Sequence, residues 1–181
     1  MVLIAIGLIL WSAAHFWKRA APDHRARFGE GGKGIVTLLL VGAIVLFVLG
    51  YRSATGAYYY GPAQPWTGIN NLLVLLAFYL FAASGKGTRV TRLIRHPQLT
   101  AVIVWAAAHL MVNGDAHSFL LFGGLALWAV AEIVVINRSE GPRGPYHAPP
   151  IKSEVIAVVA AVVIYSIVAA IHLWLGVNPF V

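Results

Sequence analysis

Long apolar runs separated by short polar segments dominate the chain. The apolar residues within each run are nearly continuous and do not alternate with polar ones, as they would in the strands of a membrane barrel. Helices satisfy their own backbone hydrogen bonds in lipid, and about 20 residues cross a bilayer. The pattern therefore predicts an all-α, polytopic membrane helix bundle that forms a single domain over residues 1–181. Its expected six transmembrane helices lie at Val2–Trp17, Ile35–Tyr51, Ile69–Ala83, Gln98–Val112, Phe119–Ile136 and Val155–Leu175.

Residues that break or bend the chain mark the connections between these runs. Pro97 stands where the fourth helix is expected to begin, and the first turn of a helix tolerates proline. The glycines between positions 29 and 34 are expected in the loop before the second helix. Asn113-Gly114-Asp115 has the composition of a tight turn, and we expect it to connect the fourth and fifth helices.

Composition supports the assignment to the membrane. Hydrophobic residues make up 60% of the 181 residues and charged residues only 10%, whereas a soluble domain has about a quarter charged residues and just under half apolar ones. A single water-soluble core of this size cannot absorb such an excess, so apolar side chains must face lipid. The absence of cysteine excludes disulfides, iron–sulfur clusters and thiolate ligands.

Basic residues are distributed unevenly over the connections. With six spans, twelve of the thirteen Lys and Arg residues fall on one side of the membrane, and only Arg52 falls on the other. Basic loops stay in the cytoplasm, so both termini are predicted to lie outside it. The first run has its positive charges after it, unlike a secretory signal peptide, and is read as a retained span. The net charge of +7 forms no basic tail or helix face, so no nucleic-acid partner is expected.

Two histidines lie within apolar runs in nearly identical settings. His15 follows Trp11 by four residues and His109 follows Trp105 by four, with small residues between them. Positions four apart share a helix face, and imidazole is a common ligand of metals and haem. A hydrogen bond between helices is the alternative role. With about 1.5 Å of rise per residue, His15 is expected roughly 10 Å nearer the cytoplasmic face than His109. His172 is also intramembrane.

Other ionisable residues are expected near the cytoplasmic face. Glu132 is predicted at a depth close to that of His15, where its carboxylate could orient His15 or His96 or could extend to water. Arg95 and His96 belong to a basic segment at a helix N-terminus, which favours anions. The same segment also fits a plain anchor for lipid headgroups.

The fourth run and its flanks carry a set of motifs that resembles a known family. These are Arg95-His96-Pro97-Gln98-Leu99, Trp105-x-x-x-His109 and Asn113-Gly114-Asp115. With them the chain resembles the NnrU family of bacterial membrane proteins, and the position of His15 is also similar. That family is linked to nitric oxide and nitrite metabolism in denitrifying bacteria. The resemblance implies an inner-membrane protein with periplasmic termini. Its expected partners are the lipid bilayer and either nitrogen-oxide reductase components or a small apolar substrate.

The NnrU family is similar in turn to the 15-cis-zeta-carotene isomerases, which hold a b-type haem through two histidines. This second resemblance implies that the present chain binds haem b with His15 and His109 as metal ligands. In the isomerases the second ligand lies thirteen residues after the histidine of Arg-His-Pro, and His109 follows His96 by thirteen residues. Haem would serve redox sensing, nitrogen-oxide handling or double-bond isomerisation, which leaves open whether the protein is an enzyme. The expected cofactor-binding residues are Trp11, His15, Arg95, His96, Trp105, His109 and Glu132.

A second resemblance competes with the first. Arg-His-Pro at the start of a late span, followed by Glu132, Tyr146 and Pro149, is distantly similar to the isoprenylcysteine and phospholipid methyltransferases. It implies S-adenosylmethionine bound against Arg95, His96 and Glu132 at the cytoplasmic face. A third possibility is a non-enzymatic membrane factor that assists the assembly of nitrogen-oxide reductases.

Overall fold

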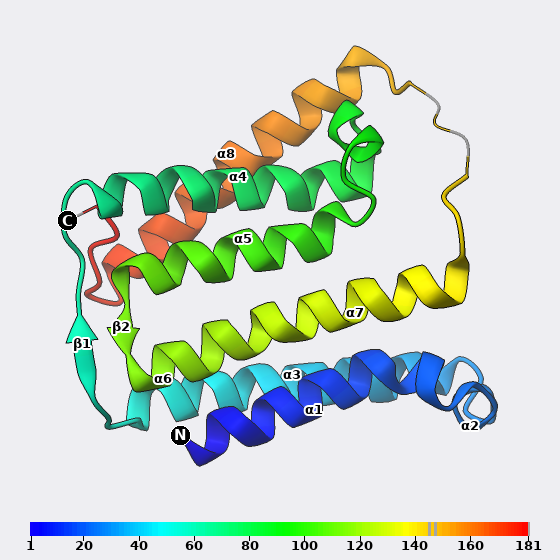
Figure 1. Cartoon of the computed structure of the whole chain (residues 1–181), viewed down its shortest axis with the longest axis horizontal. Coiled ribbons are helices and arrows are strands. Elements are labelled where there is room, and N and C mark those ends of the chain that lie inside the picture. The colour runs from blue at the N-terminus through cyan, green and yellow to red at the C-terminus, as the bar shows by residue number, and fades with distance from the viewer. Residues whose placement is uncertain (145, 147, 181) are drawn as a thin grey trace.

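Six long apolar helices make up most of the structure (Figure 1), a computed structural model that describes residues 1–144, 146 and 148–180. They are α1 (Val2–Ala20), α3 (Gly31–Ser53), α4 (Trp66–Lys86), α5 (Pro97–Val112), α7 (Gly124–Glu140) and α8 (Ile151–Trp174). Short helical segments lie between them: α2 (Pro22–Ala26), the 3-10 helix η1 (Arg89–Arg92), α6 (Ala116–Ser118) and the π-helical turn η2 (Phe119–Gly123). Two short strands, β1 (Tyr58–Tyr60) and β2 (Gly114–Asp115), complete the fold.

These helices confirm the prediction of an all-α, polytopic membrane bundle. Five segments are long and apolar enough to cross a membrane: α1, α3, α4, α8 and the continuous helix of 25 residues from Ala116 to Glu140. The sixth, α5, is apolar but has 16 residues. It begins with Pro97 in its first turn, as predicted.

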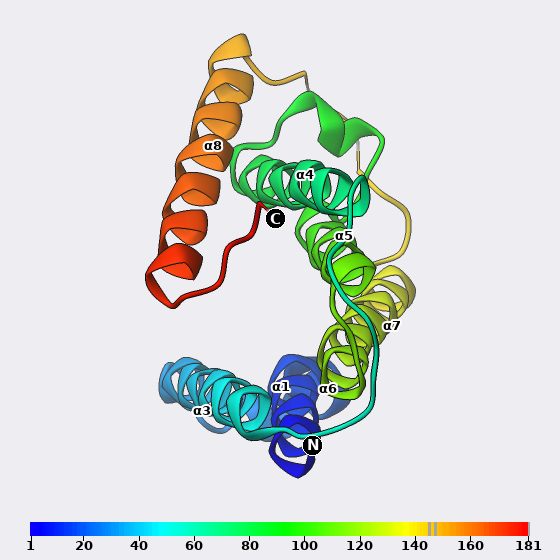
Figure 2. The ribbon, with the colours of Figure 1, turned by 90° about the vertical axis from the view of Figure 1, so that its left-hand side faces the viewer.

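The long helices form an open arc rather than a closed ring (Figure 2). Their order along the arc is α3, α1, α7, α5, α4 and α8, and each packs against the next. The main core lies where α1, α3, α5 and α7 meet; Ile4, Phe47, Leu125 and Trp128 are buried there. A smaller core joins α4 to α5 through Leu80 and Ala101. The arc therefore places α7 between the two helices that carry His15 and His109.

The helices also define two ends of the bundle. At one end α1, α4 and α7 finish and α3, α5 and α8 begin. Twelve of the thirteen Lys and Arg residues belong to this end, which we call the basic end. At the opposite end, which we call the far end, α1 and α7 begin and α5 and α8 finish (Figure 1).

Two predicted details of the connections were wrong. The glycines from Gly31 to Gly34 lie inside the first turn of α3 and not in a loop. Asn113–Asp115 is not a tight turn, because Gly114 and Asp115 pair antiparallel with Tyr60 and Tyr58. This pairing requires glycine at 114, since a Cβ atom there would lie 2.4 Å from the Tyr60 ring. The connection from α3 to α4 passes beside β2 because these two consecutive helices lie far apart in the arc (Figure 2).

Candidate functional site

The two Trp–His pairs predicted from the sequence have almost the same geometry. The ring centroids of Trp11 and His15 are 4.6 Å apart with an interplanar angle of 41°, and those of Trp105 and His109 are 4.8 Å apart at 49°. Each imidazole Nδ1 also contacts the backbone carbonyl oxygen of its own tryptophan, at 2.9 Å for His15 and 2.8 Å for His109. The resemblance between the two segments thus extends from sequence to side-chain conformation.

This hydrogen bond decides which nitrogen is free. A carbonyl oxygen can only accept, so Nδ1 carries the hydrogen, and Nε2 of the neutral ring keeps its lone pair. The described residues offer no hydrogen-bond partner to Nε2 of His15 or of His109. An imidazole held in this way by Nδ1 is oriented for ligation through Nε2.

The continuous helix Ala116–Glu140, of which α7 is the larger part, separates the two imidazoles. The His15 ring lies 4.5 Å from the Trp128 ring, and the His109 ring lies 4.7 Å from the Phe122 ring, centroid to centroid. Six positions along this helix, from 122 to 128, correspond to about 9 Å of rise. The depth difference expected from the sequence is therefore present. The two histidines pack against different turns of one helix and do not face each other directly.

Buried donors beside His15 lack acceptors. Trp11 and Trp128 pack edge to face with centroids 5.4 Å apart, and the described residues provide no hydrogen-bond partner for either indole N–H. A buried polar group without a partner calls for an explanation such as water or a bound group. The surroundings of His15 therefore fit a bound molecule that offers hydrogen-bond acceptors.

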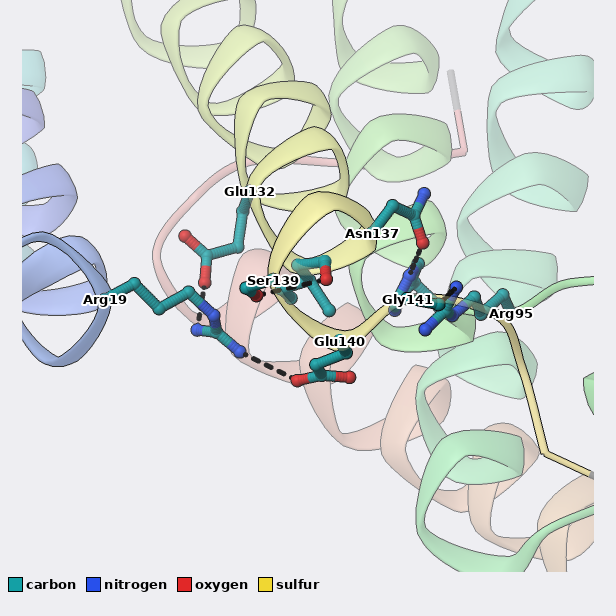
Figure 3. Close-up of polar contacts among 9 residues, drawn as sticks. Arg19, Arg95, Glu132, Asn137, Ser139, Glu140 and Gly141 are labelled. Atoms are coloured by element: carbon teal, nitrogen blue, oxygen red, sulfur yellow. Dashed lines mark hydrogen bonds and ion pairs between the residues drawn. The ribbon is translucent and has the colours of Figure 1, made fainter.

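Glu132 does not contact either histidine that it was predicted to orient, and it does not extend to water. Its side chain is buried, with the residue 4% exposed, and its Oε1 accepts from Arg19 Nη1 at 2.8 Å. Arg19 Nη2 also contacts Glu140 Oε1 at 3.3 Å. Figure 3 shows one guanidinium between two carboxylates of α7. Sequence reasoning treated Arg19 only as a loop cation, because its partner lies 113 positions away.

Arg95 and His96 form hydrogen bonds with residues at the basic end of α7, on the side of that helix opposite to Arg19. Arg95 Nη1 donates to the carbonyl oxygen of Gly141 at 2.7 Å, and His96 Nε2 is 2.9 Å from Asn137 Oδ1. Glu132 projects from the opposite side of the helix, toward α1 (Figure 3). Arg95, His96 and Glu132 therefore do not form one binding site in this structure. The arrangement that the methyltransferase resemblance requires is not present.

A polar cluster at the far end was not predicted. Asp115 accepts hydrogen bonds from the backbone N and Oγ of Ser118, at 2.7 and 2.9 Å, and contacts His117 Nε2 at 2.9 Å. Tyr51 joins this cluster through a 2.8 Å contact with Ser118 Oγ. The side chain of His117 is only 19% exposed. The Asp-x-x-Ser spacing at a helix start is the signal that could have revealed the cap.

The spatial grouping of possible ligands limits the kinds of metal site. Within the part of the chain that the structure describes, no three His, Asp or Glu side chains are grouped so that they could hold one metal ion. A site with a full set of protein ligands is thus not formed by these residues. A haem iron requires only one or two protein ligands, so the separate histidines remain compatible with haem.

Comparison with known families assigns the chain. The sequence profile of the family described as NnrU protein matches residues 2–179. The chain belongs to the NnrU family. The match covers both Trp–His pairs of this NnrU-family protein and confirms the resemblance inferred from its motifs. No curated protein and no solved structure matches the chain, so the relation of this NnrU-family member to the carotene isomerases stays a prediction.

Proposed function

We propose that this NnrU-family protein binds haem b within the membrane, with His15 and His109 as axial ligands, and takes part in nitric oxide and nitrite metabolism. The observation that carries the proposal is the equivalence of the two Trp–His pairs. Both have an Nδ1–H held by the carbonyl one turn earlier and an Nε2 without a partner among the described residues. When bound through two histidines, haem would supply one-electron chemistry.

The chain's own side chains would orient and shield such a group. Trp128 and Phe122 are both buried, at 6% exposure, and lie against the two imidazole rings. The unpartnered indole N–H groups of Trp11 and Trp128 would donate hydrogen bonds to it.

Haem content tests the proposal directly. Protein expressed with ample haem supply and purified in detergent is expected to show a Soret band and a pyridine haemochrome of the b type. We expect His109→Ala and His15→Ala to lose most of the bound haem or its low-spin spectrum. His24→Ala is the matched control, because His24 is exposed and bonded to Trp17 at the basic end, and it should retain both.

The same preparations separate the alternatives. Wild-type protein without a Soret band would refute haem binding. A haem-free protein that co-purifies with a reductase subunit would favour the assembly factor. Micromolar binding of S-adenosylmethionine in a calorimetric titration would instead favour the methyltransferase, although Arg95, His96 and Glu132 are not grouped for it.

A further inference from the structure

Glu132 has a carboxylate oxygen that its ion pair with Arg19 does not use. Oε1 accepts the hydrogen bond from Arg19, whereas Oε2 is buried and has no hydrogen-bond partner among the described residues. Figure 3 shows this second oxygen directed away from the guanidinium. An ionisable side chain inside an apolar bundle usually has a function, and a buried acceptor without a partner calls for a bound donor.

This oxygen belongs to the same helix contact as His15. We use the name α1–α7 seam for the facing residues Trp11, His15 and Arg19 of α1 and Trp128 and Glu132 of α7. Successive members on each helix are four residues apart and share one helix face. The helices touch at two levels, because Trp128 contacts the His15 ring and Glu132 contacts Arg19. Glu132 therefore lies one turn, about 6 Å, from the tryptophan that covers His15.

Toward the basic end, the seam leads to water. The exposed fraction of the side chain rises from 5% at Glu132 to 27% at Arg19 and 55% at Glu140. These three side chains are in direct contact, because the Arg19 guanidinium bonds to both carboxylates (Figure 3). A single layer of polar side chains thus separates the buried carboxylate from water at the basic end.

The charge of this cluster leaves room for one proton. One guanidinium faces two carboxylates, so the cluster carries one negative charge in excess. If Glu132 becomes neutral, Arg19 still has Glu140 as a counter-charge and is not left unpaired. The basic side chains of Arg95 and His96 bond to the opposite side of α7 and do not take part in this balance.

To the other side of Glu132, the seam holds unpartnered donors. The buried indole N–H groups of Trp11 and Trp128 have no partner among the described residues. A buried water makes about three hydrogen bonds to such groups. The turn between Trp128 and Glu132 corresponds to about two hydrogen bonds of 2.9 Å each, so one water fits between the indole and Oε2 until a bound group takes the indole.

We propose that Glu132 is a proton-transfer residue, which carries protons between water at the basic end and the group bound beside His15. This inference rests on the proposed function, which supplies that group, and adds an activity to it. In each transfer Oε2 accepts a proton from water and becomes a neutral carboxyl. It then releases the proton to the buried water or to the bound group, and the carboxylate is regenerated without any oxidant or reductant.

Infrared spectroscopy of the haem-free protein in detergent tests the exchange with water. We expect the Glu132 carboxyl to give a C=O band that appears on acidification and shifts in D2O within the mixing time, although this side chain is only 5% exposed. The chain has six acidic residues, so single substitutions can assign the band. Its absence, or a band that keeps its position in D2O, would overturn the proposal.

Three variants separate proton transfer from a purely structural role. Glu132→Gln keeps an oxygen for Arg19 and should lack the band. Glu132→Asp keeps a carboxyl and should retain a band that exchanges with solvent. Glu154→Gln is the matched control, because it replaces a carboxylate of α8 that bonds to Tyr79 of α4, away from the seam, and it should leave the Glu132 band unchanged.

The haem-loaded protein tests where the proton goes. Reduction at an electrode adds an electron to the bound group, and proton uptake with that electron lowers the midpoint potential as the pH rises. We expect this pH dependence to be weaker in Glu132→Gln than in the wild type and in Glu154→Gln. Equal slopes in all three would contradict transfer to that group. If the wild type binds no haem, the proposed function and this destination both fail, whereas the infrared measurement decides the exchange with water independently.

Discussion

A buried carboxylate in an apolar bundle depends on its partner, and Glu132 has one in Arg19. The Glu132 side chain is 5% exposed and the Arg19 side chain 27%, so the pair is partly shielded from water. Removing one member of a buried ion pair leaves an uncompensated charge, which costs about 3–5 kcal/mol. Glu140 contacts the same guanidinium, but its side chain is 55% exposed. Exposed pairs of this kind contribute about 0–1 kcal/mol.

These two contacts predict unequal effects of mutation. Arg19→Gln is expected to lower the free energy of unfolding by about 3 kcal/mol because Glu132 stays buried without a counter-charge. Glu140→Gln should lower it by less than about 1 kcal/mol. Denaturant titration in detergent micelles measures both. Equal losses in the two variants would show that the buried contact is not the dominant one.

Sequence reasoning found the histidines but not their surroundings. The four-residue spacing of Trp11 and His15 places both on one helix face, and the ring contact confirms this. Nothing in one sequence indicates that Trp128 lies against His15, because that contact depends on which helix packs beside α1. Gln98 shows the same limit. It lies on the same helical stripe as Trp105 and His109, a position that favours an inward side chain, but Gln98 is exposed.

At the scale of elements, α1 and α3 approach closely at small residues. A Cβ atom on Gly50 would lie 2.9 Å from the backbone nitrogen of Ile4, which cannot move aside without shifting α1. A Cβ atom on Gly42 of the same helix would be 3.6 Å from the end of the Leu10 side chain. Close helix packing at small residues is a general feature of membrane bundles.

The two glycines therefore predict opposite responses to alanine. Gly50→Ala is expected to destabilise the protein, because overpacking costs about 1–3 kcal/mol and outweighs the gain of about 1 kcal/mol in helix propensity. Gly42→Ala should be neutral or stabilising, because only the propensity term applies. Melting temperatures in one detergent compare the variants. A stabilised Gly50→Ala protein would contradict the close α1–α3 contact.

Element boundaries were predictable to different degrees. The apolar runs located all six long helices, because lipid requires continuous apolar surface along each span. The π-helical turn at Phe119–Gly123 lies inside such a run and leaves no mark in the hydrophobic pattern. The β1–β2 pair depends on the meeting of Tyr60 with Gly114, two segments that are distant in sequence.

At the scale of the whole molecule, the distribution of charge predicts orientation. The basic end carries twelve of the thirteen Lys and Arg residues, and basic loops are retained in the cytoplasm. We expect both termini to lie in the periplasm. Alkaline phosphatase fused after Val181 should be active, and a fluorescent protein at the same place should stay dark. The reverse result would overturn the orientation.

The order of the helices in space could not be read from the chain. Consecutive helices α1 and α3 pack together, but α3 and α4 do not, and neither do α7 and α8 over their lengths. Sequence gives the number and direction of the spans, whereas side-chain fit decides which become neighbours. The similarity of the Trp11–His15 and Trp105–His109 segments, on helices of opposite direction, would fit an inverted repeat of two halves. The arc does not support this, because α4 packs on α5 while α8 does not pack along α1.

The open arc has a mechanical consequence. Each helix packs mainly against its neighbours along the arc. Helix α8 is the last helix of the arc and packs mainly against α4. Tension on the C-terminus would therefore extract α8 first, breaking one helix–helix interface and leaving five helices in place. His172 would leave with it, while His15 and His109 would stay on their own helices, packed against Trp128 and Phe122. The helix that is removed most readily is thus also the one that carries the third intramembrane histidine.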